Sequence, residues 1–277
     1  MSRPEVTGVS VVVPVWGVYA GAPLSEALAS LRAQDVPARI VVVDNASEPA
    51  LAPVPGAATV RSPARLSVGA ARNLGLRHVD TPLVVFWDAD DLMLPGTLRR
   101  LADRIAREPA AVAVAAAIVE GDPPVAHRWP RPWVAGLARR RRAFALAHAV
   151  WSLFPTTGAT IMRTGAVRSA GGYGDANSGE DWVLGVSLAF RGALVLDPVP
   201  GRLYRRHPSS LWARRRSIGH LVAHAAAVRA RIREDVAIPA RVERLLPLIA
   251  AGQLLAAIAL HPAARAARAL RRTPRRR

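Results

Sequence analysis

A short apolar run that ends in three carboxylates places the strongest constraint on the fold. Residues 84–91 read Val-Val-Phe-Trp-Asp-Ala-Asp-Asp, and the apolar part is too short and too rich in Val and Phe for a surface helix. We expect a buried strand over Leu83 to Trp87 that delivers Asp88, Asp90 and Asp91 at its C-terminal end, the edge at which open α/β sheets bind ligands. Three carboxylates this close repel one another unless a positive group lies among them, so a hard divalent cation is one natural occupant. The alternative is an acidic turn that caps the next helix, with Asp91 near its N-cap.

Apolar strands alternate with amphipathic helices over the first 120 residues. The other expected strands are Val9–Val15, Ile40–Val43, Ala57–Val60 and Val112–Val119, and the expected helices are Leu24–Ala33, Gly69–His78 and Pro95–Arg107. Ser67 is placed to cap the second of these helices. The alternation predicts βαβ units and a mostly parallel α/β sheet flanked by helices. Asp44 and Asp88, which follow two of the strands, should then lie at the same sheet edge.

The second half of the chain changes character twice. Residues 121–142 contain four Pro and a run of four Arg, which predicts a long surface loop, either a binding loop or a solvated insertion. Order returns after it, and from about Trp212 the pattern is helical and Arg-rich to the end. We expect a first domain over residues 1–212 and a helical extension over 213–277. The apolar stretch Leu245–Leu260 is shorter than the about 20 residues that a membrane-spanning helix needs.

The charge of the chain is unevenly distributed. The net charge is +18, but residues 1–120 carry −1 and residues 121–277 carry +19. Every basic residue is Arg, which indicates a coding bias and weakens inference from Arg count alone. The neutral first half, and the lack of basic residues interleaved with aromatic ones on a sheet, argue against a nucleic-acid partner. The chain has no Cys and begins without a signal-peptide pattern, so we expect a cytoplasmic protein without disulfides.

Six short motifs follow the predicted elements in order. They are Pro14-Val15-Trp16, Asp44-Asn45-Ala46-Ser47, Gly69-Ala70-Ala71-Arg72-Asn73-Leu74-Gly75, Asp88-Ala89-Asp90-Asp91, Gly179-Glu180-Asp181 and Tyr204-Arg205-Arg206-His207. Each motif alone is weak, but in this order and spacing the chain resembles the family 2 glycosyltransferases, which have the GT-A fold. The resemblance covers roughly residues 8–212.

The resemblance implies inverting, metal-dependent transfer of a sugar from a nucleotide-diphosphate sugar to an acceptor hydroxyl, in cell-envelope glycan, glycolipid or natural-product glycosylation. The nucleotide-sugar half would be about residues 1–120 and the acceptor half about 121–212. The residues implied in donor binding are Pro14, Val15, Trp16, Asp44, Asn45, Arg72, Asp88, Ala89 and Asp90. Many relatives have two acids at positions 44 and 45, whereas this chain has Asp-Asn, so the sequence does not decide which nucleotide the donor carries. Asp44 could equally stabilise a turn at the strand end.

The resemblance also assigns the metal and the catalytic base. Asp90 and His207 would hold Mg²⁺ or Mn²⁺, although His207 could be a surface histidine. Asp181 would take the proton of the acceptor with Glu180 in support, although acids are also common at helix starts. Gly179 and Trp182 would contact the acceptor, and Trp182 could equally belong to the core.

Two other functions fit parts of the sequence. A nucleotidyltransferase also uses a metal and an α/β sheet, but it usually carries a Gly-rich basic loop after the first strand, where this chain has Pro14-Val15-Trp16-Gly17. A basic nucleic-acid-binding protein fits the net charge alone. The C-terminal helices would either bind the inner face of the membrane beside a lipid-linked acceptor, or cover the sheet or form a dimer.

Overall fold

The structure, a computed structural model, describes residues 8–121, 125–205 and 218–236, together with positions 240, 243–245, 248, 251 and 255. The chain forms two compact units, Met1–Arg206 and His207–Arg277. The domain boundary predicted at residue 212 lies outside the described residues. The second unit contains helix α8, Ile218–Asp235. In the described part of the chain, no helix combines the length and apolar character needed to cross a membrane.

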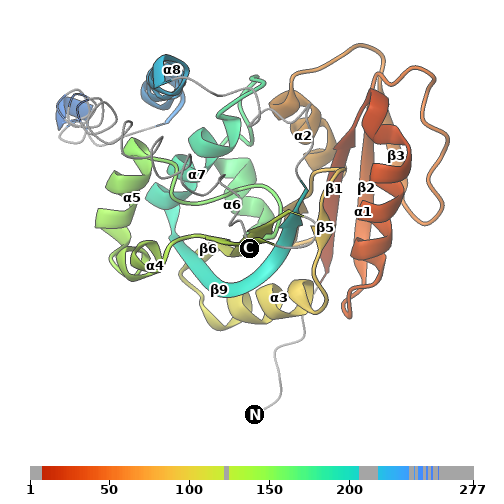
Figure 1. Ribbon diagram of the computed structural model, residues 1–277, viewed down its shortest axis with the longest axis horizontal. Coiled ribbons are helices and arrows are strands. Elements are labelled where there is room, and N and C mark those ends of the chain that lie inside the picture. The colour runs from red at the N-terminus through yellow and green to blue at the C-terminus, as the bar shows by residue number, and fades with distance from the viewer. Residues whose placement is uncertain are drawn as a thin grey trace, which may run out of the picture. The chain divides into compact units, whose positions relative to one another are not determined.

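A mixed sheet organises the first unit (Figure 1). Over the described residues it has nine strands in the order β3-β2-β1-β4-β8-β6-β9-β5, with β7 paired to β6. The strands are β1 Val9–Val15, β2 Ala38–Asn45, β3 Ala58–Ser62, β4 Leu83–Phe86, β5 Leu92–Met93, β6 Ala111–Glu120, β7 Val125–Trp129, β8 Thr160–Arg163 and β9 Ala193–Tyr204.

The N-terminal part of this sheet is parallel, as the sequence predicts. Strands β3, β2, β1 and β4 pair in parallel, with Val15 opposite Asp44 and Val12 opposite Phe86. The C-terminal ends of these strands therefore meet at one edge, where the motifs after β1, β2 and β4 lie. The remainder is mixed, because β8 runs antiparallel to both β4 and β6. Strand β9 is parallel to β6 and antiparallel to β5, and it curves strongly around the sheet (Figure 1).

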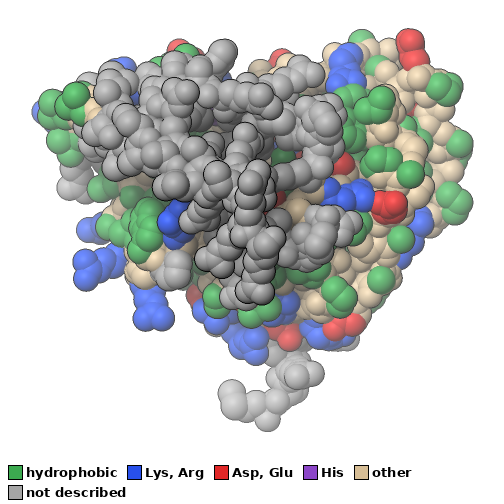
Figure 2. All heavy atoms as spheres, viewed as in Figure 1, with side chains coloured by type: hydrophobic (Ala, Val, Ile, Leu, Met, Phe, Trp, Pro, Cys, Tyr) green, Lys and Arg blue, Asp and Glu red, His purple; other side chains and the backbone are tan. Residues whose placement is uncertain are grey.

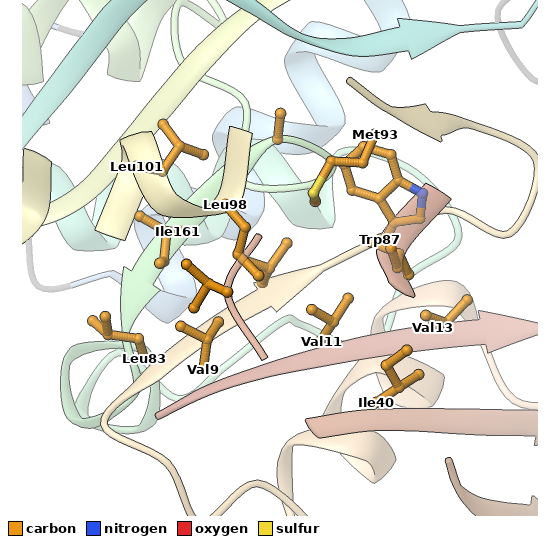
Figure 3. Close-up of a cluster of buried hydrophobic side chains, with 14 of the residues drawn as sticks. Val9, Val11, Val13, Ile40, Leu83, Trp87, Met93, Leu98, Leu101 and Ile161 are labelled. Carbon is orange, nitrogen blue, oxygen red and sulfur yellow. The ribbon is translucent and has the colours of Figure 1, made fainter. Parts of the chain in front are cut away.

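Helices cover both faces of the sheet. One face packs against α1 Ala22–Arg32 and α3 Thr97–Arg107. The other packs against α2 Val68–Leu76, α4 Pro132–Ala138, α5 Arg141–Val150, α6 Thr164–Ser169 and α7 Glu180–Arg191. The period-2 alternation of a strand sends Val11 and Val13 into the first core and Val12 into the second. Figure 3 shows the first core, in which β1 side chains face α3.

Helix α2 begins and packs as its sequence predicts. The Ser67 side chain accepts a hydrogen bond from the N–H of Ala70 at 3.1 Å, which confirms the predicted N-cap. Gly75 allows the helix to lie close to the sheet, because a Cβ there would be 2.3 Å from Cγ1 of Val12. This close approach sets the distance between the sheet and the preceding turn of the helix, which carries Arg72.

The long loop predicted over residues 121–142 is wrong for most of that range. Residues 125–129 form β7, and α4 begins at Pro132. A Pro in the first turn starts a helix rather than breaking it, because its missing N–H would have no partner there, and Val134 anchors α4 in the core. The four exposed arginines of 139–142 then lie at the junction of α4 and α5. Basic side chains project at the lower left of Figure 2, where Figure 1 places these helices.

Candidate active site

The turn Asp88–Asp91 closes directly after β4. The N–H of Asp91 donates to the C=O of Asp88 at 3.3 Å, and the indole N–H of Trp87 donates to the C=O of Asp91 at 3.1 Å. The Trp87 ring is fully buried in the first core (Figure 3), so the turn is fixed from beneath by a rigid side chain. Asp91 is not a helix cap: α3 starts at Thr97, and its N-cap is Gly96.

Asp91 is instead the most deeply buried acid of the turn. One of its oxygens accepts from Nε of Arg202 at 2.6 Å, and the other accepts from the backbone N–H of Arg205 at 3.0 Å. Burial raises the pKa of Asp91 to about 6; the Arg202 charge opposes this shift, and the charges of Asp88 and Asp90 add to it. The carboxylate is still ionised at neutral pH and forms an ion pair with Arg202.

Asp88 lies between two arginines. Its Oδ1 accepts from Nη2 of Arg72 at 2.9 Å and its Oδ2 accepts from Nη2 of Arg202 at 2.6 Å. Burial alone would raise its pKa, but the two guanidinium groups outweigh burial and hold the pKa below its usual range. The side chain is 27% exposed, so an ionised carboxylate remains partly accessible at the sheet edge.

Arg72 connects this turn to the start of α7. Its Nη1 donates to Oε1 of Glu180 at 2.6 Å, while Nη2 holds Asp88, and the guanidinium lies 5.1 Å from the ring centroid of Tyr173. The side chain is buried, and although burial opposes it, the charges of Asp88 and Glu180 raise the pKa of Arg72. The guanidinium of Arg72, which is 108 residues before Glu180 in the sequence, therefore joins the acidic turn to the start of α7.

The two acids at the start of α7 differ in their surroundings. Glu180 is buried against Arg72, and burial together with the neighbouring charge of Asp181 raises its pKa. Asp181 is only partly buried, and its Oδ1 accepts from the N–H of Trp182 at 2.8 Å. Thr156 Oγ1 donates to the backbone C=O of Asp181 at 2.8 Å, which fixes this turn of the helix. Gly179, the N-cap, has a φ of 77°, a left-handed conformation that favours glycine.

Trp182 lies in the protein interior. The residue is 6% exposed, and its indole N–H donates to the backbone C=O of His148. This placement favours the core role that the sequence left open. Its predicted role as a wall of the acceptor site stays a prediction, without support from the packing.

The residues after β2 organise the local backbone. Asp44 is fully buried: Oδ1 accepts from the N–H of Ser47 at 2.9 Å, and Oδ2 accepts from the N–H of Leu51 and from Arg61. Burial raises the pKa of Asp44, but these hydrogen bonds outweigh burial and the net shift is downward. Nδ2 of Asn45 donates to the C=O of Leu66 at 3.0 Å, and its Oδ1 accepts from the N–H of Leu66 at 2.8 Å. Both side chains thus stabilise turns, as the alternative for Asp44 predicts.

The residues after β1 present a different surface. Pro14 and Val15 are buried in the strand, whereas Trp16 is partly exposed. The guanidinium carbon of Arg65 lies 4.3 Å from the Trp16 ring centroid, and the Trp16 ring meets Tyr19 edge to face. An exposed aromatic surface backed by a cation therefore lies at the end of β1, beside the end of β2.

The comparison with known protein families identifies the family of this chain. The family model described as glycosyl transferase family 2 matches residues 10–168. The chain belongs to glycosyl transferase family 2. It is a glycosyltransferase with the GT-A fold, as its six motifs predict. No curated protein matches the sequence significantly.

Solved structures share the fold at low sequence identity. TarS of S. aureus, residues 1–349 in complex with UDP-GlcNAc, is 17% identical with a TM-score of 0.62, over 86% of this chain and 70% of that chain. The mannosyltransferase PcManGT from Pyrobaculum calidifontis, in complex with GDP-Man and Mn²⁺, is 22% identical with a TM-score of 0.59, over 94% of this chain and 76% of that chain. At these identities the likeness establishes the fold of this glycosyltransferase.

The family implies a divalent metal, and the acids of the turn fit one mode of holding it. Among the described residues, no cluster of three or more His, Asp or Glu could enclose an ion. Mg²⁺ is commonly bound by one or two carboxylates together with substrate phosphates. Of the two partly exposed acids, Asp88 and Asp90, Asp90 fits that mode, because both oxygens of Asp88 already accept from arginines. Ala89 is buried between the two acids. The second predicted ligand, His207, lies outside the described residues.

The sequence pattern missed the role of Arg202 in this glycosyltransferase. Arg202 lies within β9 and reaches Asp88 and Asp91, more than 100 residues earlier in the chain. The available signal was an arginine inside a strand, because a buried Arg requires partners. That signal shows that partners exist, but it does not identify them. Arg205, in the motif that starts at Tyr204, donates its backbone N–H to Asp91 and its Nε–H to the C=O of Asp90.

Proposed function

We propose that this glycosyltransferase moves a sugar from a nucleoside-diphosphate sugar to an acceptor hydroxyl with inversion, using Mg²⁺ or Mn²⁺. The observation that carries the proposal is the ion-pair chain Asp88–Arg72–Glu180, because it joins the acidic turn after β4 to the acids that start α7. These ion pairs would link a donor site at the acidic turn to a catalytic base at the start of α7. The nucleotide sugars bound by TarS and PcManGT support the choice of donor.

The donor half of the site uses the sheet edge. Trp16 offers an aromatic face for the nucleotide base, and the turn formed by Asp44 and Asn45 shapes the floor beside it. Asp88, ionised and partly exposed, accepts hydrogen bonds from the ribose or the sugar. Asp90 and His207 would hold the metal. Bound there, Mg²⁺ or Mn²⁺ would supply Lewis-acid neutralisation of the charge on the departing diphosphate.

The transfer step needs one base. Asp181 takes the proton of the acceptor hydroxyl while the acceptor oxygen forms a bond to the anomeric carbon. The bond from that carbon to the diphosphate oxygen breaks on the opposite side, and its electron pair leaves with the diphosphate. Asp181 suits this role better than Glu180, because Glu180 is buried against Arg72 whereas Asp181 is partly exposed. Arg72 and Glu180 keep the start of α7 in place.

The acceptor is proposed to be lipid-linked, at the inner face of the membrane. The net charge of +19 over residues 121–277 supports this, because an anionic membrane surface attracts clustered basic residues by about 1 kcal/mol each.

The assignment of the base is tested with Asp181→Asn. We expect donor binding to stay near that of the wild type and transfer to fall by roughly two to four orders of magnitude, since general base catalysis is removed while the shape of the site is kept. Donor affinity is measured by calorimetry with UDP or GDP and Mn²⁺, and transfer by release of the nucleotide from a panel of nucleotide sugars. Glu180→Gln is the matched control at the neighbouring acid. Wild-type turnover by Asp181→Asn would remove Asp181 as the base.

The metal assignment is tested with Asp90→Ala. We expect metal-dependent nucleotide binding to be lost while the fold persists, because Asp90 is a partly exposed turn residue. The control is Asp35→Ala, which removes an exposed acid that pairs with Arg99 on the protein surface. Calorimetry with Mn²⁺, with and without EDTA, gives the result; retained metal-dependent binding by Asp90→Ala would contradict the assignment.

A further inference from the structure

Arg202 pairs with two carboxylates of the acidic turn and with one backbone carbonyl. Its Nη2 donates to Asp88 at 2.6 Å, its Nε donates to Asp91 at 2.6 Å, and its Nη1 donates to the C=O of Thr157 at 3.3 Å. The side chain is buried, and although burial opposes it, the charges of Asp91 and Asp88 raise the pKa of Arg202. One guanidinium therefore holds two of the three acids of the turn.

The fold is shaped to admit this side chain. Arg202 is opposite Met93 in the antiparallel pairing of β9 with β5, so the end of β9 lies alongside the segment that follows the turn. Gly158 has a φ of 80°, and a Cβ at that position would be 2.3 Å from Nη1 and 2.6 Å from Cδ of Arg202. The space that a side chain at 158 would need is occupied by the arginine.

We propose that Arg202 is a positioning residue for the donor site, an inference that rests on the proposed function. By binding Asp88 and Asp91 together, it fixes the conformation of the turn that presents Asp90. It also cancels negative charge that would otherwise repel the diphosphate of the donor. Arg72 shares Asp88 but continues to Glu180, so it cannot replace Arg202 at Asp91.

The experiment must separate positioning from simple stabilisation. Arg202→Met leaves Asp91 buried without its cation, which is strongly destabilising, whereas removing both partners of a buried ion pair is often close to neutral. The informative variant is therefore Arg202→Met combined with Asp91→Leu, with Asp88 left paired to Arg72. Arg202→Lys is the conservative variant, because it keeps the charge but lacks the planar group that holds both acids in this geometry.

A matched control is an arginine that pairs with an acid of the same strand. Arg100 on α3 donates to Asp197 of β9 at 2.6 Å, so Arg100→Met breaks an ion pair of β9 near the other end of that strand. It is expected to lower the melting temperature and to leave nucleotide affinity unchanged.

Three quantities are measured on the full-length chain. They are the melting temperature without ligand, the calorimetric Kd of UDP and GDP with Mn²⁺, and amide hydrogen exchange of residues 88–93 without ligand. We expect the double variant to recover most of the stability lost in Arg202→Met. Its Kd should stay weaker than that of the wild type by about tenfold or more, and its turn should exchange faster. Arg202→Lys should give an intermediate Kd.

Two outcomes would overturn the proposal. If the stabilised double variant binds nucleotide within about twofold of the wild type and protects the turn equally, Arg202 contributes stability alone. Tighter binding in either variant would show that Arg202 competes with the donor for Asp88. If the wild type binds neither nucleotide, the proposed function fails, and the ligand-free exchange of the turn still decides whether Arg202 positions it.

Discussion

His148 provides a test of the packing behind helix α7. It lies on α5, fully buried, with its ring stacked on Phe144 at a centroid distance of 6.0 Å. Its Nδ1 accepts from the N–H of Leu153 at 2.9 Å, so the proton of the neutral ring is on Nε2, which faces Gly185 of α7 and has no hydrogen-bond partner among the described residues. A charged imidazole has nowhere to be solvated there, and burial lowers the pKa of His148 to about 3.

The size of the effect follows from this shift. The unfolded chain takes up a proton at His148 near pH 6.5, whereas the folded chain does so only near pH 3. Between these values the unfolded state binds more protons, so the free energy of unfolding falls as the pH falls. At about 1.4 kcal/mol for each pH unit, lowering the pH from 6.5 to 5 destabilises the protein through His148 by about 2 kcal/mol.

The assay compares urea denaturation of the wild type and His148→Asn at pH 7 and pH 5. Asn can place an acceptor near the position of Nδ1 but does not titrate. The variant therefore loses an amount of stability that does not change with pH, because its side chain is smaller. We expect the stability difference between the two proteins to shrink by about 2 kcal/mol at pH 5. Asp91, whose raised pKa acts in the opposite direction over this range, is common to both proteins and cancels. Parallel pH profiles would refute the reasoning.

Two further predictions concern the backbone and the strand end. Gly158→Ala should lower stability clearly more than Gly96→Ala. Both glycines have positive φ (80° and 68°), but an added Cβ meets Arg202 only at position 158. The melting temperatures of the two variants test this. Asp44, whose folded pKa is lowered, stabilises the protein above its unfolded value of 3.8 and loses that effect as the pH falls below it. Asp44→Asn should therefore lower stability at pH 7 and make the free energy of unfolding fall less steeply below about pH 4. An unchanged slope below that pH would contradict this.

The elements that the sequence predicts well are those fixed by local pattern. Strand β1 has the predicted bounds, Val9–Val15, because a continuous apolar run buried on both faces has few alternatives. Ser67 caps α2 because a hydroxyl before a helical run satisfies a free backbone N–H. The loop predicted over 121–142 was wrong because Pro and Arg content describes composition, and Pro132 serves as a helix start.

The parts that the sequence could not supply depend on long-range pairing. Spacing alone did not show that Asp91 pairs with Arg202 instead of capping a helix. The choice between surface and core for Trp182 was also undecided, because an aromatic residue after two acids suits either. In each instance the deciding partner lies on an element that is distant in sequence, and helical or strand periodicity carries no information about it.

The two buried arginines also change the meaning of the net charge. The chain has 38 basic residues, all Arg, and that number alone does not identify a partner. Within the described residues only Arg72 and Arg202 are buried, and both bind Asp88. A planar guanidinium can hold two carboxylates at once, which the single ammonium of a lysine cannot do with the same geometry. The anionic partners of these two arginines are therefore the protein's own acids. A donor diphosphate would approach a turn whose negative charge the arginines already largely balance. The affinity for the donor would then depend on how firmly the arginines hold the acids of that turn.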